Sequence, residues 1–233
     1  IAMKFEDDHA ETKLINARIC SEDDDIMLVT NTGRAIRFPT TVVCVFNSRN
    51  SVGVRGIKLG DDQEVVSMSV IRHFDATSDE RSAYLKMRRA VAGLADDADS
   101  ATDEDVNENA TISPERYAEM SAAENLILTV TSGGQGKLSS SHDYPVRGRG
   151  GMGVTAMDKA MRGGSLLASF PVDLDDQIML ATSKGQSIRV PVDGISFRSR
   201  SAGGVRIFNT GKGEEVVSVA WIADSGEEEG EEE

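Results

Sequence analysis

The sequence predicts an all-β fold built from repeated units of four short strands, with one mainly helical insertion. Three observations predict this fold. A hairpin sequence occurs three times, a Gly-Val pair follows each hairpin after about 20 residues, and an acidic stretch with helix signals separates the first unit from the second. Self-similarity at a fixed period is typical of propellers, solenoids and other repeat folds.

The hairpin copies are alike in their strands and in their turn. Each has an apolar strand followed by a glycine, which supplies the positive φ that a tight turn demands. The copies are Val29–Arg34, Val130–Gln135 and Ala181–Gln186, with turn glycines Gly33, Gly134 and Gly185. The second and third copies are 51 residues apart, and the first and second are 101 apart. Removing residues 73–124, a stretch of about 50 residues, brings the longer spacing close to the shorter one, so we expect that stretch to be an insertion.

A second set of matching positions lies downstream of each hairpin. A Gly-Val pair recurs there, and an arginine stands four residues before each glycine. The pairs begin at Gly53, Gly153 and Gly204, and the arginines are Arg49, Arg149 and Arg200. Another apolar run closes the unit at 65–70 and at 216–221. Each unit therefore reads as four short strands with structural turn glycines between them, which is the signature of a propeller blade.

The repeats divide the chain into blades. We expect residues 1–24 to be the end of a preceding blade, with strands at Ala2–Phe5 and Leu14–Cys20. The predicted blades are 25–72, 125–175 and 176–223. About three and a half blades are thus present, whereas propellers close with about 4–8. Because the chain also opens on Ile rather than Met, we expect it to be a fragment with further blades upstream of residue 1.

The insertion and the C-terminus have signals of their own. Thr77–Glu80 is a capping box, and apolar residues follow it at helical spacing up to Leu94. Ser113, followed by Pro, predicts an N-cap for a short helix that ends near Ala123. Residues 96–105 read as a solvated acidic linker, and 224–233 form an acidic tail that we expect to be disordered.

The net charge of −14 argues against a nucleic-acid partner, but its distribution does not. The net charges are −4 for 1–24, +2 for 25–72, −8 for 73–124, +3 for 125–223 and −7 for 224–233. The repeats are therefore basic, and the acidic charge lies in the segments attached to them.

Each repeat has a loop rich in Arg, Gly, Ser and Asn. Guanidinium groups bind phosphate oxygens, and small residues let the backbone approach them. The candidate DNA-binding residues are Arg49, Arg55, Lys58, Arg147, Arg149, Arg198, Arg200 and Arg206. One such loop per blade predicts an arc of positive charge for bent duplex DNA. The alternative is that these loops are exposed turns, preserved by duplication alone.

Other candidate sites are weaker. His9, His73 and His142 have no carboxylate or Cys at metal-ligand spacing, so we expect surface or core histidines and no metal site. Cys20 and Cys44 form no CxxC motif, and we expect both to be small buried hydrophobic residues in a reducing compartment. The sequence contains no catalytic constellation, no apolar run long enough for a membrane helix and no secretory signal.

Several motifs in order resemble the C-terminal β-pinwheel domain of the DNA gyrase A protein, and gyrase is a type IIA DNA topoisomerase. They are Phe38–Pro39, Asn50–Ile57, Val65–Val70, Arg147–Gly153 and the acidic end. The insertion looks like the helical insertion found in some bacterial gyrases. The resemblance implies a six-bladed wheel that wraps double-stranded DNA around its basic rim and so supports ATP-dependent negative supercoiling.

The resemblance also implies the partners and their location. They are DNA, the remainder of a dimeric gyrase A protein, and the gyrase B protein, in the bacterial cytoplasm and its nucleoid. ATP and Mg²⁺ act through the gyrase B protein and other domains in that family, which leaves no cofactor for this chain. The cleavage tyrosine belongs to another domain and is not Tyr84, Tyr117 or Tyr144, so we do not expect the fragment to be catalytic alone.

One departure from the family keeps other interpretations open. In the gyrase family, a Gln-Arg-Arg-Gly-Gly-Lys-Gly box lies in the first blade of the domain. The similar segment Arg147–Gly153 of this chain lacks the Gln and has Met152 in place of the Lys. We therefore expect the box upstream of residue 1. The alternatives are the equivalent domain of the topoisomerase IV A protein, which has fewer blades and binds DNA without strong wrapping, and a propeller scaffold for protein partners.

Overall fold

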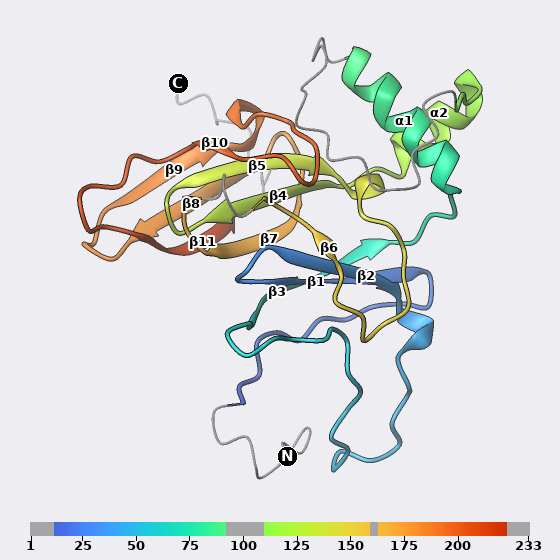
Figure 1. Ribbon diagram of the computed structural model, residues 1–233, viewed down its shortest axis with the longest axis horizontal. Helices are drawn as coiled ribbons and strands as arrows, with labels where there is room; N and C mark the ends of the chain where they lie inside the picture. Colours follow the sequence, from blue (N-terminus) through green and yellow to red (C-terminus); the bar gives the residue numbers. More distant parts are fainter. Residues whose placement is uncertain (1–11, 92–109, 159–162, 223–233) are drawn as a thin grey trace, which may run out of the picture.

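The computed structural model describes residues 12–91, 110–158 and 163–222 (Figure 1). The strands are β1 Asp24–Thr30, β2 Arg34–Pro39, β3 Val65–Arg72, β4 Leu126–Thr131, β5 Gln135–Ser140, β6 Val154–Thr155, β7 Leu166–Val172, β8 Gln177–Thr182, β9 Ser187–Pro191, β10 Val205–Arg206 and β11 Val216–Ile222. The helices are α1, Ser78–Val91, and α2, Pro114–Ala122. Short 3-10 turns at Thr40–Val42, Ser141–Asp143 and Val192–Gly194 follow β2, β5 and β9. A mainly β fold with a helical insertion is thus confirmed.

Each sequence repeat contributes one antiparallel hairpin to a sheet, and in the first two sheets this hairpin is central. The hairpins are β1–β2, β4–β5 and β8–β9, and β3, β7 and β11 pair beside them. The turn glycines Gly33, Gly134 and Gly185 have φ of 83°, 75° and 80°. Only glycine adopts this region without steric strain, so the turn residue and the hairpin position were both predictable.

The fourth strand of a sheet comes from the following repeat. Val154–Thr155 of the second repeat pairs with Arg34–Ala35 of the first, and Val205–Arg206 of the third pairs with Gln135–Gly136. The third sheet has three strands within the described residues, in the order β11-β8-β9. The expectation that each repeat supplies all four strands of its own blade is therefore wrong, because the loop before each Gly-Val pair crosses to the preceding sheet.

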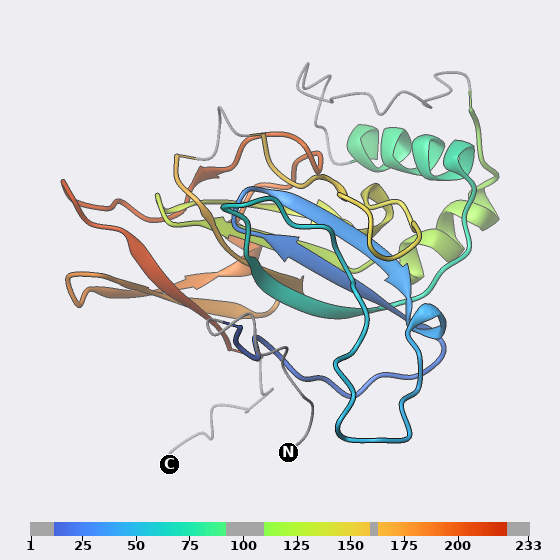
Figure 2. The same cartoon turned by 60° about the horizontal axis from the view of Figure 1, so that its bottom comes forward.

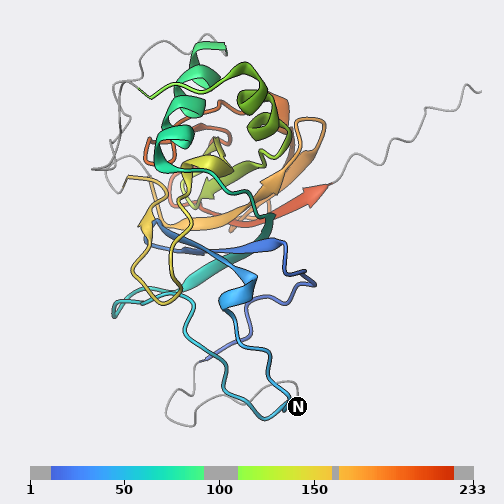
Figure 3. The same cartoon turned by 90° about the vertical axis from the view of Figure 1, so that its right-hand side faces the viewer.

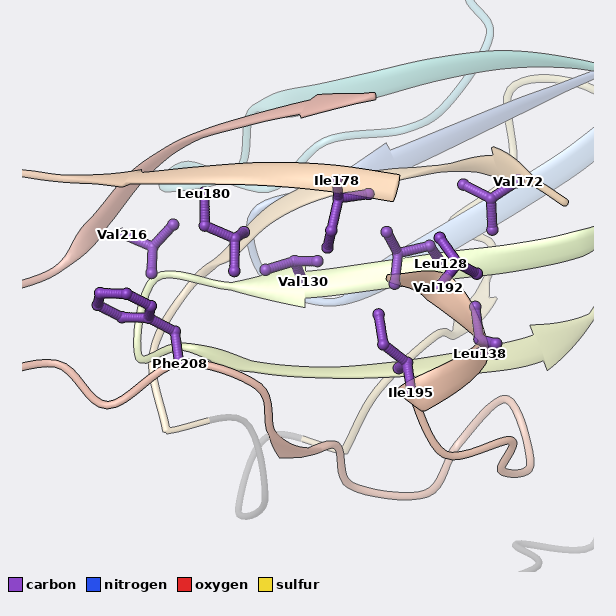
Figure 4. Packing of buried hydrophobic residues seen from close by; sticks show 10 residues of the cluster. All are labelled: Leu128, Val130, Leu138, Val172, Ile178, Leu180, Val192, Ile195, Phe208 and Val216. Atoms are coloured by element: carbon purple, nitrogen blue, oxygen red, sulfur yellow. The ribbon is translucent and has the colours of Figure 1, made fainter. Parts of the chain in front are cut away.

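Two hydrophobic clusters lie between neighbouring repeats, and a smaller one lies within the first repeat. One cluster joins Met27 and Val29 of the first repeat to Ile127, Tyr144 and other residues of the second. A second cluster joins β4 and β5 to the third repeat, and Figure 4 shows its ten buried side chains facing one another. Each repeat thus buries much of its apolar surface against a neighbour, which is the usual reason that repeats stack.

The insertion forms the two predicted helices. Thr77 and Glu80 make the reciprocal bonds of a capping box, with N···O distances of 2.8 and 3.2 Å. The Ser113 hydroxyl accepts from Arg116 N–H at 3.1 Å, as expected of an N-cap. Figures 1 and 2 show α1 and α2 side by side at one end of the second sheet. Leu94 and the predicted linker 96–105 lie outside the described residues.

Aromatic contacts hold the helices against the turn Ser141–Asp143. The Tyr84 and His142 ring centroids are 5.0 Å apart, and those of Phe74 and His142 are 5.5 Å apart. The Arg88 guanidinium lies 4.6 Å from the centre of the Phe197 ring, which belongs to the third repeat. The insertion is therefore packed against the sheets where the second and third repeats meet.

Two sequence expectations fail near the N-terminus. Residues 12–20 contain no strand, so the predicted strand Leu14–Cys20 is wrong; Ala2–Phe5, His9 and the tail 224–233 lie outside the described residues. Cys20 and Cys44 are exposed rather than buried, because the segments that carry them do not pack into a core of the described structure. Within the described ranges, every helix is too short or too polar to cross a membrane.

Candidate nucleic-acid interface

Two basic, glycine-containing loops meet between the first and second repeats. They are residues 47–58 and 147–153, and we call this place the loop crossing. Gly150 N–H donates to Gly56 O at 2.6 Å, and Lys58 N–H donates to Gly151 O at 2.8 Å. The first loop extends away from the sheets on the side opposite the helices (Figures 1 and 3). Backbone pairing therefore joins two basic segments that are far apart in the sequence.

The loop crossing has exposed basic side chains. Arg49, Arg55, Lys58 and Arg147 are all exposed, and no hydrogen bond or ion pair joins their side chains to another described residue. An exposed guanidinium or ammonium group can form charge-assisted hydrogen bonds with an anion such as phosphate. In a chain with 39 carboxylates, four basic side chains without a partner among the described residues indicate a surface that can receive an anionic ligand.

Arg149 lies within the loop crossing but is partly buried. Its Nε donates to Val42 O at 3.0 Å, and a terminal nitrogen donates to Arg55 O at 3.1 Å. A guanidinium has five N–H donors, so these two bonds leave donors for another acceptor. Arg149 therefore both holds the two loops together and keeps some capacity to contact a phosphate.

Arg200 has a different environment from the one predicted. Its side chain is only 3% exposed. Its Nε donates to Asp143 O at 2.8 Å, and a terminal nitrogen donates to Thr155 O. The predicted DNA contact at Arg200 is therefore withdrawn, because a buried guanidinium that is hydrogen-bonded to the preceding repeat cannot reach a phosphate at the surface.

The other two arginines of the third loop are less enclosed. Arg198 is partly buried, and its backbone N–H donates to Leu138 O at 2.7 Å. Arg206 is exposed in β10, and its guanidinium donates to Asn209 Oδ1 at 3.2 Å. The third loop is thus tied to the second sheet along much of its length and exposes fewer basic groups than the loop crossing.

Lys137 fixes the third loop from inside and was missed in the sequence. Its side chain is fully buried, and Nζ donates to Ser199 O at 2.9 Å, Ala202 O at 2.6 Å and also to Arg200 O. Burial lowers the pKa of Lys137 to about 7. The corresponding residues, three after the turn glycine in the other repeats, are Ile36 and Ile188. The sequence could have indicated this role, because a lysine replaces the isoleucine found at the same position of the other two repeats.

Arg34 is a second residue that sequence reasoning missed. It follows the turn glycine of the first repeat, where the second and third repeats have Gln135 and Gln186. Arg34 and Lys58 line the same hollow beside the loop crossing. The sequence could have indicated this residue as well, because an arginine replaces the glutamine found at the same position of the other two repeats.

The histidines take part in local structure. His73 Nδ1 lies 2.7 Å from Asp25 Oδ1, and Nε2 lies 3.1 Å from Asp75 Oδ1. His142 is buried, with Nε2 2.8 Å from Met120 O. Among residues 12–91, 110–158 and 163–222, no group of three or more His, Cys, Asp or Glu side chains is arranged to hold a metal ion.

Sheets that each contain one repeated hairpin, completed by a strand from the next repeat, place this chain among the domains of the β-propeller class. The family model described as the DNA gyrase C-terminal domain, β-propeller, matches residues 24–72, 125–172 and 176–220. The chain belongs to this family. The break between the first two matched segments coincides with the helical insertion.

Curated relatives agree with the family assignment. The DNA gyrase A protein of Granulibacter bethesdensis is 44% identical over 231 residues, covering 94% of this chain and 24% of the relative. That of Rickettsia bellii is 37% identical over 231 residues, covering 98% of this chain and 25% of the relative. The chain thus spans about a quarter of the length of these relatives.

A solved structure shows the same fold. It is described as the C-terminal domain of DNA topoisomerase IV, and it superposes with a TM-score of 0.65 at 17% identity. The superposition covers 94% of this chain and 52% of that chain. At this identity the likeness supports the fold alone.

Proposed function

We propose that this chain is a DNA-binding and DNA-wrapping part of a DNA gyrase A protein and supports ATP-dependent negative supercoiling of double-stranded DNA. The observation that carries the proposal is the loop crossing, where Arg49, Arg55, Lys58 and Arg147 are exposed without described partners. Membership of the DNA gyrase C-terminal domain family supports it.

The chemistry of the loop crossing suits phosphate rather than bases. Arginine and lysine bind phosphate oxygens with little regard to sequence, whereas base readout needs side chains that enter a groove. A Cβ at Gly148 would have nothing within 4 Å, so this part of the second loop leaves room for a sugar-phosphate backbone to approach. The binding free energy would come from phosphate contacts and would offset the bending of the duplex.

The proposed partners follow from the same assignment. They are duplex DNA, the remainder of a dimeric gyrase A protein, and the gyrase B protein. In that assembly ATP and Mg²⁺ would act at other domains and in the gyrase B protein, and DNA cleavage would occur outside this chain. The proposed location is the bacterial cytoplasm, at the nucleoid.

The salt dependence of DNA binding tests the proposal. The chain should bind a short duplex of arbitrary sequence, with log K falling linearly against log salt concentration by about 0.9 for each phosphate contact. The triple variant Arg49→Gln, Arg55→Gln and Arg147→Gln should bind more weakly and with a flatter slope. The charge-matched control is Lys13→Gln, Arg18→Gln and Arg72→Gln, three exposed bases outside the loop crossing, and it should retain most of the affinity.

Two results would contradict the proposal. Failure of the unmodified chain to retain duplex DNA at low salt would favour a scaffold for protein partners. Equal losses in the two triple variants would show that overall charge, rather than the loop crossing, governs binding.

Wrapping is tested separately from binding. A nicked circular DNA ligated in the presence of the chain should change its linking number if the DNA wraps, and should keep it if the DNA only binds. Tight binding without a linking-number change would favour the alternative of a topoisomerase IV domain.

A further inference from the structure

A hollow beside the loop crossing has the features of an anion site. Its volume is about 180 Å³, and it is lined by Arg34, Lys58, Leu59, Gly60, Gln63 and Met152. Lys58 and Met152 belong to the two loops that meet at the loop crossing, and Lys58 N–H is bonded to Gly151 O. The hollow is therefore continuous with the surface proposed to contact DNA.

The polar side chains that line this hollow can supply hydrogen-bond donors. The side chains of Arg34 and Lys58 have no hydrogen bond or ion pair to another described residue. Gln63 Oε1 accepts from Gly60 N–H at 3.0 Å, so its acceptor is used and its NH₂ group remains as a donor. A guanidinium, an ammonium and an amide NH₂ around one space match the acceptor oxygens of a phosphate.

Carboxylates lie near the hollow but do not line it. Asp61 and Asp62 belong to the same turn as Gly60 and are exposed outside the lining. Asp158 lines an adjoining hollow of about 400 Å³ that also includes Arg34. No ion pair joins Asp158 to Arg34, and the Asp158 backbone N–H donates to Ser201 O at 2.9 Å. Among the described residues, neither Arg34 nor Lys58 thus forms an ion pair with these acids.

The basic character is specific to the first repeat. The positions that match Arg34 and Lys58 are Gln135 and Asp158 in the second repeat, and Gln186 and Asn209 in the third. Hairpin geometry does not need a base at the Arg34 position, since the other two repeats form the same hairpin with Gln there. The hairpin therefore does not explain the base at Arg34.

We infer that the hollow formed by Arg34, Lys58 and Gln63 receives one backbone phosphate of bound duplex DNA. This inference rests on the proposed function and adds Arg34 and Gln63 to the contact surface. The three side chains donate to phosphate oxygens, so the contact carries no base preference. The hollow anchors the DNA strand where it enters or leaves the loop crossing.

The test compares Arg34→Gln and Lys58→Gln with the unmodified 233-residue chain in duplex binding at several salt concentrations. Each variant should bind several-fold more weakly at low salt and lower the slope of log K against log salt by about 0.9. Gln63→Glu keeps the oxygen that accepts from Gly60 N–H but puts a negative charge in the hollow, so it should weaken binding as well. Thermal unfolding should stay unchanged for Arg34→Gln and Lys58→Gln, because their side chains have no described partners.

The matched control is Arg72→Gln. Arg72 is exposed at the end of β3, seven residues along the strand from Val65, or about 23 Å at ~3.3 Å per residue, and Val65 begins the strand that follows Gln63 of the hollow. This variant removes the same charge outside the hollow and should bind nearly as the unmodified chain does.

Three outcomes would overturn the inference. Unchanged binding by all three hollow variants, alongside steep salt dependence of the unmodified chain, would refute the hollow and leave the proposed function intact. No DNA binding by the unmodified chain would refute both. If Arg34→Gln abolishes binding of inorganic phosphate alone but keeps full affinity for duplex DNA, the hollow binds free phosphate and is not a DNA contact.

Discussion

Arg149 and Arg200 make the same pair of backbone contacts, one repeat apart. Each guanidinium donates to the last residue of a 3-10 turn in the preceding repeat, Val42 or Asp143. Each also donates to the backbone carbonyl of the residue that directly follows the Gly-Val pair of the preceding repeat, Arg55 or Thr155. The recurring arginine thus links neighbouring repeats, which explains its recurrence without any ligand.

The first prediction follows from this link. Arg200→Ala should lower the free energy of unfolding by about 2–4 kcal/mol, because it removes a buried guanidinium and leaves Asp143 O and Thr155 O without their donor. Urea denaturation measures the change. Arg49→Ala, which removes an exposed arginine from the same repeat position, should stay within about 0.5 kcal/mol of the unmodified chain. Equal changes in the free energy of unfolding for the two variants would contradict the claim that Arg200, unlike Arg49, is buried and links two repeats.

The second prediction concerns Lys137. Lys137→Met keeps the length of the side chain but removes the donor to three backbone carbonyls, so we expect a loss of about 2 kcal/mol. A second measurement uses pH. Burial lowers the pKa of Lys137 to about 7, from 10.5 for an exposed lysine. Between these values the unfolded state binds more protons, so this group makes stability rise with pH. Lys137→Met should lose that rise, and an unaltered pH profile would contradict the role of the amine.

The third prediction concerns the contact between the helical insertion and the sheets. Burial lowers the pKa of His142 below its usual 6.5. As the pH falls below about 6.5, the unfolded state takes up a proton first, so the free energy of unfolding should fall. Urea midpoints measured from about pH 8 to pH 5 should show this loss, and His142→Gln should reduce it.

His73 provides a control of opposite sign. Burial lowers its pKa, but hydrogen bonds and charges of Asp25 and Asp75 outweigh burial, so its pKa is raised overall. Its contribution to stability is fully present below about 6.5 and is lost as the pH rises through the higher folded-state pKa. His73→Gln should therefore flatten the profile above pH 6.5. If the two variants change the profile in the same direction, the assignment is wrong.

The fourth prediction concerns the strand that crosses between sheets. A Cβ at Gly153 would lie 2.3 Å from Ala35 O, and φ there is +70°. Gly153→Ala should destabilise the chain by about 2 kcal/mol or more, because it both strains the backbone and pushes β6 away from β2. Gly148→Ala, with nothing within 4 Å of its Cβ, is the control in the same loop. Similar urea midpoints for the two variants would contradict the close approach.

The hairpins and helices were predictable because their signals are local. Gly33 needs a positive φ whatever surrounds it, and the capping box of Thr77 and Glu80 closes within one helical turn. The two-residue strand Val154–Thr155 has no such signal. It forms a strand because it pairs with β2 of the preceding repeat. That pairing is not visible in the local sequence, which therefore assigns the strand to the blade of its own repeat.

The candidate site was predictable in part for the same reason. Arg55, Lys58 and Arg147 are exposed as expected, whereas Arg200 is buried in a loop of similar composition. Arg34 was missed because it lies outside the loops rich in Arg, Gly, Ser and Asn from which the candidates were taken. Its neighbour Lys58 is 24 residues away in the chain, and only the fold brings them to one hollow.

By itself, the sequence determined the repeat, the turn at each hairpin, the helix caps and the basic character of the repeats. These features depend on residue type and short-range spacing. Tertiary structure alone decided which sheet each short strand joins and which arginines face solvent. A side chain's exposure depends on the repeat packed against it, and Arg49 and Arg200 occupy equivalent positions with different surroundings.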